Sequence, residues 1–389
     1  MGIDISSGGG LFGRRPTRAG LIVSDVVEDR RGVDRVGSQA RAVTTPFWDG
    51  LLTGGLSLVG MSAILLYIAF GGEVGFVEAN WFALAILINS PHFMASYRLL
   101  YSSAAEIRAN PWSTIYVPAA LVAILGFCFF AARPGALVQW LVLISSIYLA
   151  WHYTGQTWGM VASFSHLHGV RYSDRERFLI RSGPRSLLVL HVLFALTGRL
   201  PPGGYIAPDT YVAAYSAVFV ATCATIGASV IAGGWAFVSA YRRGEQIPIQ
   251  VILPWASLFL WYPFWYFVPG GFFWLQLSHA LQYLAFPLRV EVNRYSEAAP
   301  RTPGQRNLWA LLLYAGLVLV GAVILHGPPI AAHAFGDGWY STPRAKVLLL
   351  ALTTCIAIHH FFIDGAVWKL RNPRVRQSLF SHVETRTPV

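Results

Sequence analysis

Apolar residues dominate the chain in long runs that are broken by short polar and basic segments. A helix needs about 20 apolar residues to cross the hydrocarbon core of a bilayer. Ten runs come close to this length, and Pro or Gly stands at most of their boundaries. The pattern predicts transmembrane helices over residues 47–70, 79–101, 114–132, 135–160, 184–199, 210–236, 248–268, 271–290, 307–327 and 345–368.

The basic residues provide an independent test of this count, because hydropathy alone places the runs. If the N-terminus lies in the cytoplasm and the spans alternate, 25 of the 29 lysines and arginines fall on the cytoplasmic side. Cytoplasmic loops of membrane proteins carry such an excess of Lys and Arg. We therefore predict an all-α, polytopic transmembrane bundle of about ten helices, with both termini cytoplasmic.

The composition agrees with this class. Hydrophobic residues make up 55% of the chain and charged residues 12%, whereas soluble proteins have roughly 25% charged residues. The net charge of +11 is divided among short clusters rather than gathered on a face or stripe, which argues against nucleic-acid binding. Residues 1–45 are rich in Gly, Arg, Asp and Ser, and we expect a disordered cytosolic tail there. We further expect a membrane domain over 46–370 and a cytosolic tail over 371–389. The expected location is the bacterial inner membrane.

Polar and ionisable side chains inside the predicted spans are few, and each is costly in hydrocarbon. Apart from a lone His191, they lie on four even-numbered spans, which all run from outside to inside. The groups are Asn89 with His92, His152 with Gln156, Gln276 with His279 and Gln282, and His359 with His360 and Asp364.

The depth of these histidines is similar. A basic residue follows His92, His279 and His360 by six to ten residues, so at 1.5 Å per residue their depths agree to within about 6 Å. His152 lies about as far from the end of its own span. We predict that one plane holds all four imidazoles.

Each of these histidines also has a polar neighbour three or four residues away, on the same helical face. Imidazoles that bind a metal normally donate their second N–H to an oxygen acceptor. We expect Asn89, Gln156 and Gln282 to orient the rings in this way. His359 and His360 are about 100° apart around their helix, so they need not reach one centre. The predicted metal ligands are His92, His152, His279 and His360, followed by Asp364 and His359.

Other histidines have simpler interpretations. A lone histidine in a membrane helix is usually an interhelical hydrogen-bonding group, and His191 fits that description. His166 and His168 lie just past the fourth predicted span, where a solvated loop is favoured over a role in closing the metal site from below.

This arrangement resembles, in its general character, the integral-membrane multi-histidine iron oxygenases. They include fatty-acid desaturases and hydroxylases, and the Brp/Blh carotenoid-cleaving proteins, which also place histidines inside helices. The desaturase HxxxH and HxxHH boxes are absent, and only the His359-His360 pair, the His166-Leu167-His168 triplet and the segment 359–365 come near them. The resemblance covers only the histidine-bearing helices and extends to the type of chemistry alone.

The resemblance implies one or two iron ions that activate dioxygen against a lipophilic substrate from the bilayer. Neutral imidazoles with one carboxylate suit iron, copper or zinc rather than magnesium or calcium. Tyr97, Tyr153 and Tyr283 are candidates to donate a proton or hydrogen bond. No cofactor-binding domain is evident, so a separate electron donor or the substrate itself would supply reducing equivalents. Membrane lipids are the other expected partners.

Three other classes remain open. A haem protein would use some of these histidines as axial ligands. A transporter would use them to bind substrate or relay protons, and Pro91 and Gly155 offer helix breaks. A scaffold for another membrane complex is the third alternative.

Overall fold

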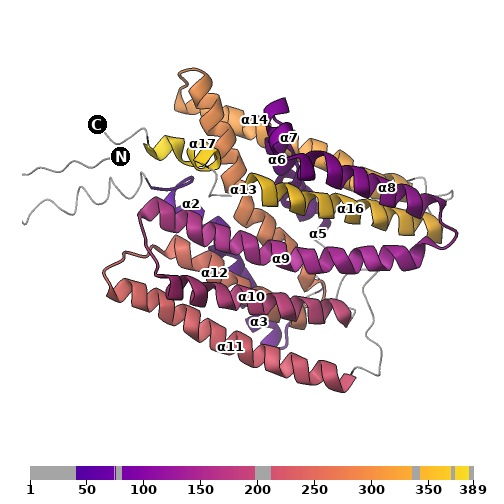
Figure 1. The fold of residues 1–389 in the computed structure, drawn as a ribbon, viewed down its shortest axis with the longest axis horizontal. Coiled ribbons are helices and arrows are strands. Elements are labelled where there is room, and N and C mark those ends of the chain that lie inside the picture. Colours follow the sequence, from indigo (N-terminus) through magenta and orange to yellow (C-terminus); the bar gives the residue numbers. More distant parts are fainter. Residues whose placement is uncertain are drawn as a thin grey trace, which may run out of the picture.

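A computed structural model describes residues 41–73, 75, 81–197, 212–334, 342–368 and 373–384, and these residues contain helices and no strand. The long helices α9 (Pro134–His168), α10 (Asp174–Leu196), α11 (Val212–Arg242) and α16 (Pro343–Val367) lie roughly parallel along the longest axis (Figure 1). Helix α13 (Gly271–Ala298) crosses their direction. The protein is therefore an all-α bundle, as predicted.

Helical structure occurs in each of the ten predicted ranges. Several of these segments contain a π-helical turn, labelled η, between two α-helical parts. The remaining elements are α2 (Pro46–Gly50), η1 (Leu51–Gly55) and α3 (Leu56–Ala69); α5 (Trp81–Leu84), η2 (Ala85–Asn89) and α6 (Ser90–Leu100); α7 (Ala104–Ala109); η3 (Trp112–Tyr116) and α8 (Val117–Phe130); α12 (Ile249–Phe267); α14 (Pro303–Gly321), η5 (Ala322–His326) and α15 (Gly327–Ala334); and α17 (Pro373–Glu384).

Seven helices within the described residues are long and apolar enough to cross a membrane. They are Pro46–Ala69, Trp112–Phe130, Pro134–His168, Asp174–Leu196, Ala213–Arg242, Pro303–His326 and Pro343–Val367. Three predicted spans fall outside this set. Their helices are long enough but less apolar: α5 to α6 and α13 contain His with Asn or Gln, and α12 is rich in Trp, Tyr and Pro.

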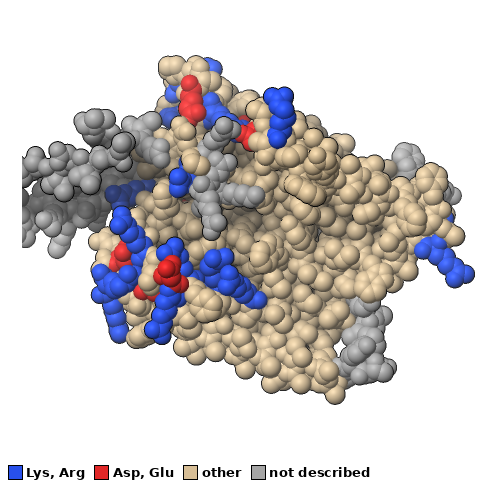
Figure 2. Space-filling model, in the orientation of Figure 1, with Lys and Arg blue, Asp and Glu red and all other residues tan. Residues whose placement is uncertain are grey.

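Lys and Arg side chains on the visible face gather mainly at the end of the bundle where α9 ends and α10 begins (Figure 2). The two described ends of the chain meet on this side. Val43 is fully buried, and its N–H donates to Asp49 Oδ2 at 2.7 Å. The C-terminal helix α17 packs on α13, where Asn293 Nδ2 donates to the carbonyl oxygen of Leu379 at 3.1 Å. Residues 1–40 and 385–389, most of the predicted tails, lie outside the described residues.

The centre of the bundle is aromatic. Helix α12 contributes Trp261, Tyr262 and Phe264, each no more than 1% exposed, and it packs against α3, α9 and α13. Helix α16 packs against α6, α8 and α9, and α6 also packs against α13. The four helices that carry the predicted histidines, α6, α9, α13 and α16, are thus held next to one another.

The contact between η1 and α12 depends on a glycine. A Cβ atom on Gly54 would lie 2.4 Å from the carbonyl oxygen of Leu253. We expect Gly54→Ala to destabilise the protein by roughly 1–3 kcal/mol through overpacking, and to lower the apparent Tm in detergent. The matched control is Gly60→Ala on α3, where a Cβ would meet nothing within 4 Å. Equal Tm values for the two variants would contradict the close contact.

Candidate metal centre

A proline and a π-helical turn position the first histidine. Pro91 has no N–H, so the carbonyl oxygen of Leu87 lacks its normal helical partner. That oxygen instead accepts a hydrogen bond from the Tyr314 hydroxyl at 2.5 Å. The π turn η2 immediately precedes this point, and π turns change the direction in which the following side chains face. His92 follows directly and points into the bundle, fully buried.

Four imidazoles meet at one point. His92 comes from α6, His152 from the middle of α9, His279 from α13 and His360 from α16. One nitrogen from each ring lies within 4.8 Å of one nitrogen of every other ring. The Nε2 atoms of His152 and His279 are 3.0 Å apart, and those of His360 and His92 are 2.9 Å apart. All four side chains are 8% exposed or less.

Asp364 adds an oxygen to this cluster. It lies one helical turn after His360, and its Oδ2 atom is 3.5 Å from Nε2 of both His152 and His360. None of the described residues forms a hydrogen bond with Asp364 Oδ2, although this atom is buried. Its other oxygen, Oδ1, accepts a hydrogen bond from the Tyr283 hydroxyl at 3.0 Å. A buried carboxylate oxygen that accepts no hydrogen bond is energetically costly, and a bound cation would compensate its negative charge.

The spacing of these atoms fits one metal ion. Metal–imidazole bonds are about 2.1 Å long, so two nitrogens at right angles around one ion are about 3.0 Å apart. The separations of 2.9 and 3.0 Å match this value. The donor set is four imidazole nitrogens with one carboxylate oxygen at its edge. Its residues can therefore hold a cation of the class that imidazole favours.

The predicted orienting amides behave differently from one another. Gln156 Nε2 donates to the backbone carbonyl of His279 at 3.0 Å, so it anchors the helix that carries this ring rather than the ring itself. Gln282 turns away and donates to the Thr53 carbonyl oxygen at 2.7 Å and to Ser257 Oγ. Asn89 lines a cavity beside His92. The Nδ1 atoms of His92, His279 and His360 have no hydrogen-bond partner among the described residues.

His359 lies outside the cluster. Its Nδ1 atom is 3.0 Å from the Tyr97 hydroxyl, and its Nε2 atom is 2.8 Å from the Ser113 carbonyl oxygen. The 100° step between adjacent residues of a helix turns this ring toward α6 and η3, away from His360. Although His359 is a predicted ligand, the structure does not bring it to the centre.

The three predicted tyrosines occupy different places. The Tyr283 hydroxyl lies between Asp364 Oδ1 and Ser96 Oγ, 2.7 Å from the latter, and it also accepts a hydrogen bond from Trp368 Nε1. Tyr153 packs its ring 4.5 Å from that of His279, centroid to centroid. The Tyr97 hydroxyl contacts His359 rather than one of the four clustered imidazoles. Ser96 and Trp368 are additions to the predicted set, and each lies four residues from a predicted ligand.

His191, His166 and His168 do not join the centre. His191 Nδ1 is 3.2 Å from the Tyr262 hydroxyl, which is the hydrogen-bonding role predicted for it. Helix α9 continues to His168, so His166 and His168 lie in its last turn rather than in a loop beyond it. The ring of His166 packs 5.4 Å from that of Phe380 on α17.

Two cavities border the histidine cluster. A cavity of about 640 Å³ reaches His92, His279 and His360 from the N-terminal halves of α9 and α16, and we name it the outer cavity after the predicted topology. An inner cavity of about 240 Å³ reaches His152 and Asp364 from their C-terminal halves. The cluster therefore separates two spaces and is accessible from both.

Comparison with known proteins yields no relative. No family model, curated protein sequence or solved structure matches this chain. Fold alone does not determine function, so the chemistry of the cluster is the basis for assigning one.

The structure separates two adjacent histidines, and this difference is testable. We expect His360→Ala to abolish stoichiometric binding of a divalent metal, because it removes one of four converging nitrogens. We expect His359→Ala to retain the metal, since that ring faces Tyr97 and Ser113. Elemental analysis of both variants, purified in detergent without chelators, measures the difference. Equal loss of metal in the two variants would contradict the assignment.

Proposed function

We propose that the protein is a membrane-embedded, metal-dependent oxidoreductase that acts on a lipophilic substrate, with non-haem iron at the histidine cluster. The observation that supports this most directly is the convergence of four buried imidazoles beside Asp364 Oδ2, an oxygen without a hydrogen bond from the described residues. Such a set would hold a redox-active divalent metal next to the two cavities. Iron, when bound, would supply dioxygen activation.

The donor set favours iron among the metals that imidazole binds. Zinc sites are usually tetrahedral, with four ligands or three ligands and water. Here a fifth protein donor, the Asp364 carboxylate, lies beside four nitrogens whose close pairs fit right angles. Five donors exceed the four of a tetrahedral zinc site, so the set favours a metal that accepts more ligands. Copper and zinc are the alternatives.

A haem is disfavoured by the same distances. A porphyrin fills the four equatorial positions of its iron and leaves two axial positions for histidines. One nitrogen from each of four rings lies within 4.8 Å of the others here, which leaves no space for a macrocycle between them.

The chain's own residues have distinct roles in this proposal. Asp364 balances one unit of the metal's positive charge. Tyr283 holds Asp364 Oδ1 through its hydroxyl, and it is in turn held by Ser96 and Trp368. The surrounding helices exclude bulk water and give access from lipid, which fits a lipophilic substrate. Reducing equivalents would come from a separate protein or from the substrate. The bundle would have about ten transmembrane helices, with both termini in the cytoplasm.

A transporter is the second candidate, and the two cavities on opposite sides of the cluster favour it. Alternating access requires spaces that open on the two sides of one binding site. If the protein is instead an oxidoreductase, the metal stays bound and does not cross the membrane.

The iron assignment predicts the metal content of the purified protein. We expect about one equivalent of iron, lost in His92→Ala, and an absorption spectrum without the sharp bands of reduced haem. Asp364→Asn should weaken iron retention by about 10–100-fold, because it removes the carboxylate that lies beside the imidazoles of His152 and His360. His191→Ala is the control, since its ring bonds Tyr262 instead. Well-folded protein without stoichiometric metal would overturn the proposal.

The transporter alternative has its own test. Proteoliposomes that enclose a fluorescent iron chelator should show no uptake of iron(II) beyond that of protein-free vesicles. Uptake that is abolished by His152→Ala would instead establish transport through the cluster.

A further inference from the structure

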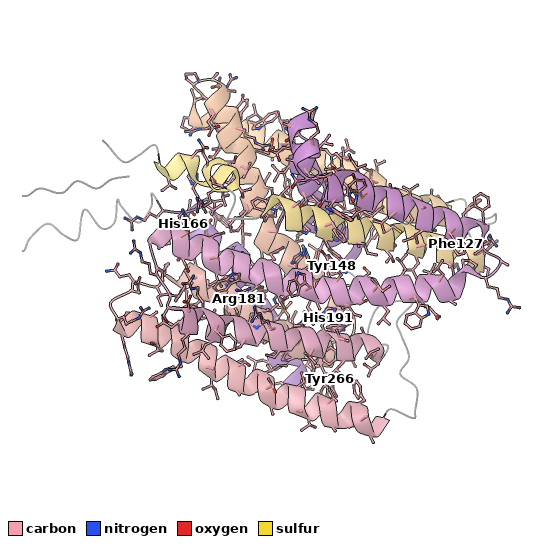
Figure 3. The ribbon with its side chains drawn as sticks, viewed as in Figure 1. Phe127, Tyr148, His166, Arg181, His191 and Tyr266 are labelled. Carbon is pink, nitrogen blue, oxygen red and sulfur yellow. The ribbon has the colours of Figure 1, made fainter. Side chains whose placement is uncertain are left out.

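The inner cavity lies where α9, α13 and α16 meet, on the Asp364 side of the histidine cluster. Aromatic and apolar side chains form most of its wall, including Tyr148, Trp151, Phe286, Phe361 and Trp368. Tyr148 points from α9 toward the neighbouring α16 (Figure 3), and its ring stacks on that of Phe362, with centroids 5.1 Å apart. A space with such walls fits hydrocarbon rather than an ion or a sugar.

Glycines open this cavity to the outer surface of the bundle. Gly155 and Gly159 lie one turn apart on α9, and Gly365 faces the same space from α16. A Cβ atom on any of the three would meet nothing within 4 Å, and Gly155 and Gly365 are exposed. Trp151, one turn before Gly155, is 62% exposed at the edge of the opening. The cavity is therefore continuous with the lipid-facing surface between the two helices.

One polar group inside the cavity lacks a partner and belongs to no metal ligand. The amide of Gln156 lines this space, and its Nε2 atom donates to the His279 carbonyl oxygen. That bond fixes the orientation of the amide and leaves Oε1 as an acceptor. Oε1 is buried and has no hydrogen-bond partner among the described residues. Such a group is costly unless a ligand supplies a donor.

We infer that the inner cavity binds an elongated lipophilic alcohol, which enters from the bilayer between α9 and α16 and donates its hydroxyl hydrogen to Gln156 Oε1. This inference rests on the proposed function, because it places the substrate beside His152 and Asp364. The open glycine edge admits the chain, the aromatic wall holds it, and the unpaired amide oxygen selects the hydroxyl.

The size of the cavity agrees with a single chain. At about 240 Å³ it is smaller than the roughly 300–1,000 Å³ of pockets that enclose a whole small molecule. It accommodates the reacting end of a ligand whose remaining chain stays in the bilayer. The outer cavity is larger and contains more polar side chains, among them Asn89, Gln276 and His326, and it suits water and small reactants.

Photo-crosslinking tests the site with a defined probe, a long-chain alcohol that carries a diazirine in the chain. In nanodiscs, we expect adducts on peptides that cover residues 148–160 and 361–368, located by mass spectrometry. Gly155→Leu with Gly159→Leu should reduce this labelling at least tenfold by filling the opening. The matched control is Gly227→Leu on α11, an exposed helical glycine that also has nothing within 4 Å of its Cβ position.

The hydroxyl contact is tested with the methyl ether of the same probe, which has no donor. We expect the alcohol to label the wild-type protein several-fold better than the ether, and Gln156→Leu to abolish that preference. Unchanged labelling in the double glycine variant, or equal labelling by alcohol and ether, would overturn the inference. Metal content is measured on the same samples. If the variants lose labelling but retain iron, the change affects the alcohol site and not the metal centre. If the wild-type protein contains no iron, the proposed function is contradicted instead.

Discussion

The structure depends on how a buried carboxylate is compensated. Asp364 is 6% exposed, and its Oδ2 atom lies 3.5 Å from Nε2 of His152 and of His360, with no hydrogen-bond partner among the described residues. A charge in that position costs several kcal/mol in the interior of a membrane protein unless an opposite charge is present. A cation between the four imidazoles and Asp364 would turn this cost into a stabilising interaction. The same ion would connect α6, α9, α13 and α16, so the centre would hold the bundle together as well as carry its chemistry.

Around this centre the structure divides space into two chemically different halves. His152 and Asp364 face the inner cavity with its aromatic wall, and the other three ligand candidates face the outer, more polar one. An enzyme that oxidises a lipophilic compound needs such a separation, because the hydrocarbon chain and the small polar reactants must reach one ion by different routes. The division follows from the position of the cluster halfway along α9, with one cavity toward each end of that helix.

Much of this organisation could be predicted from the sequence. Helical structure occurs in each of the ten ranges that hydropathy predicted, since apolar runs bounded by Pro and Gly have few alternative structures. Seven of these segments are long and apolar enough to span a membrane among the described residues. The count of ten spans and the orientation of the termini stay predictions. The convergence of His92, His152, His279 and His360 followed from their similar depth on separate helices.

The rotation of each helix could not be predicted, and most differences at the site arise from it. His359 turns to Tyr97 because one residue changes the facing direction by about 100°. Gln282 donates to the Thr53 carbonyl oxygen rather than to an imidazole, and the π turn before His92 changes the face that α6 presents. The predicted fourth span ends at residue 160 because hydropathy falls where polar residues begin. Backbone hydrogen bonding continues past that point, so helix α9 extends to His168.

The central claim is that four imidazoles and Asp364 surround one metal ion, and X-ray absorption spectroscopy at the metal edge tests it most directly. The account predicts about four nitrogen scatterers near 2.1 Å, with the outer-shell signals of imidazole rings, and a reduced imidazole contribution in His152→Ala. A shell of sulfur atoms, or of oxygen atoms without imidazole signals, would contradict it.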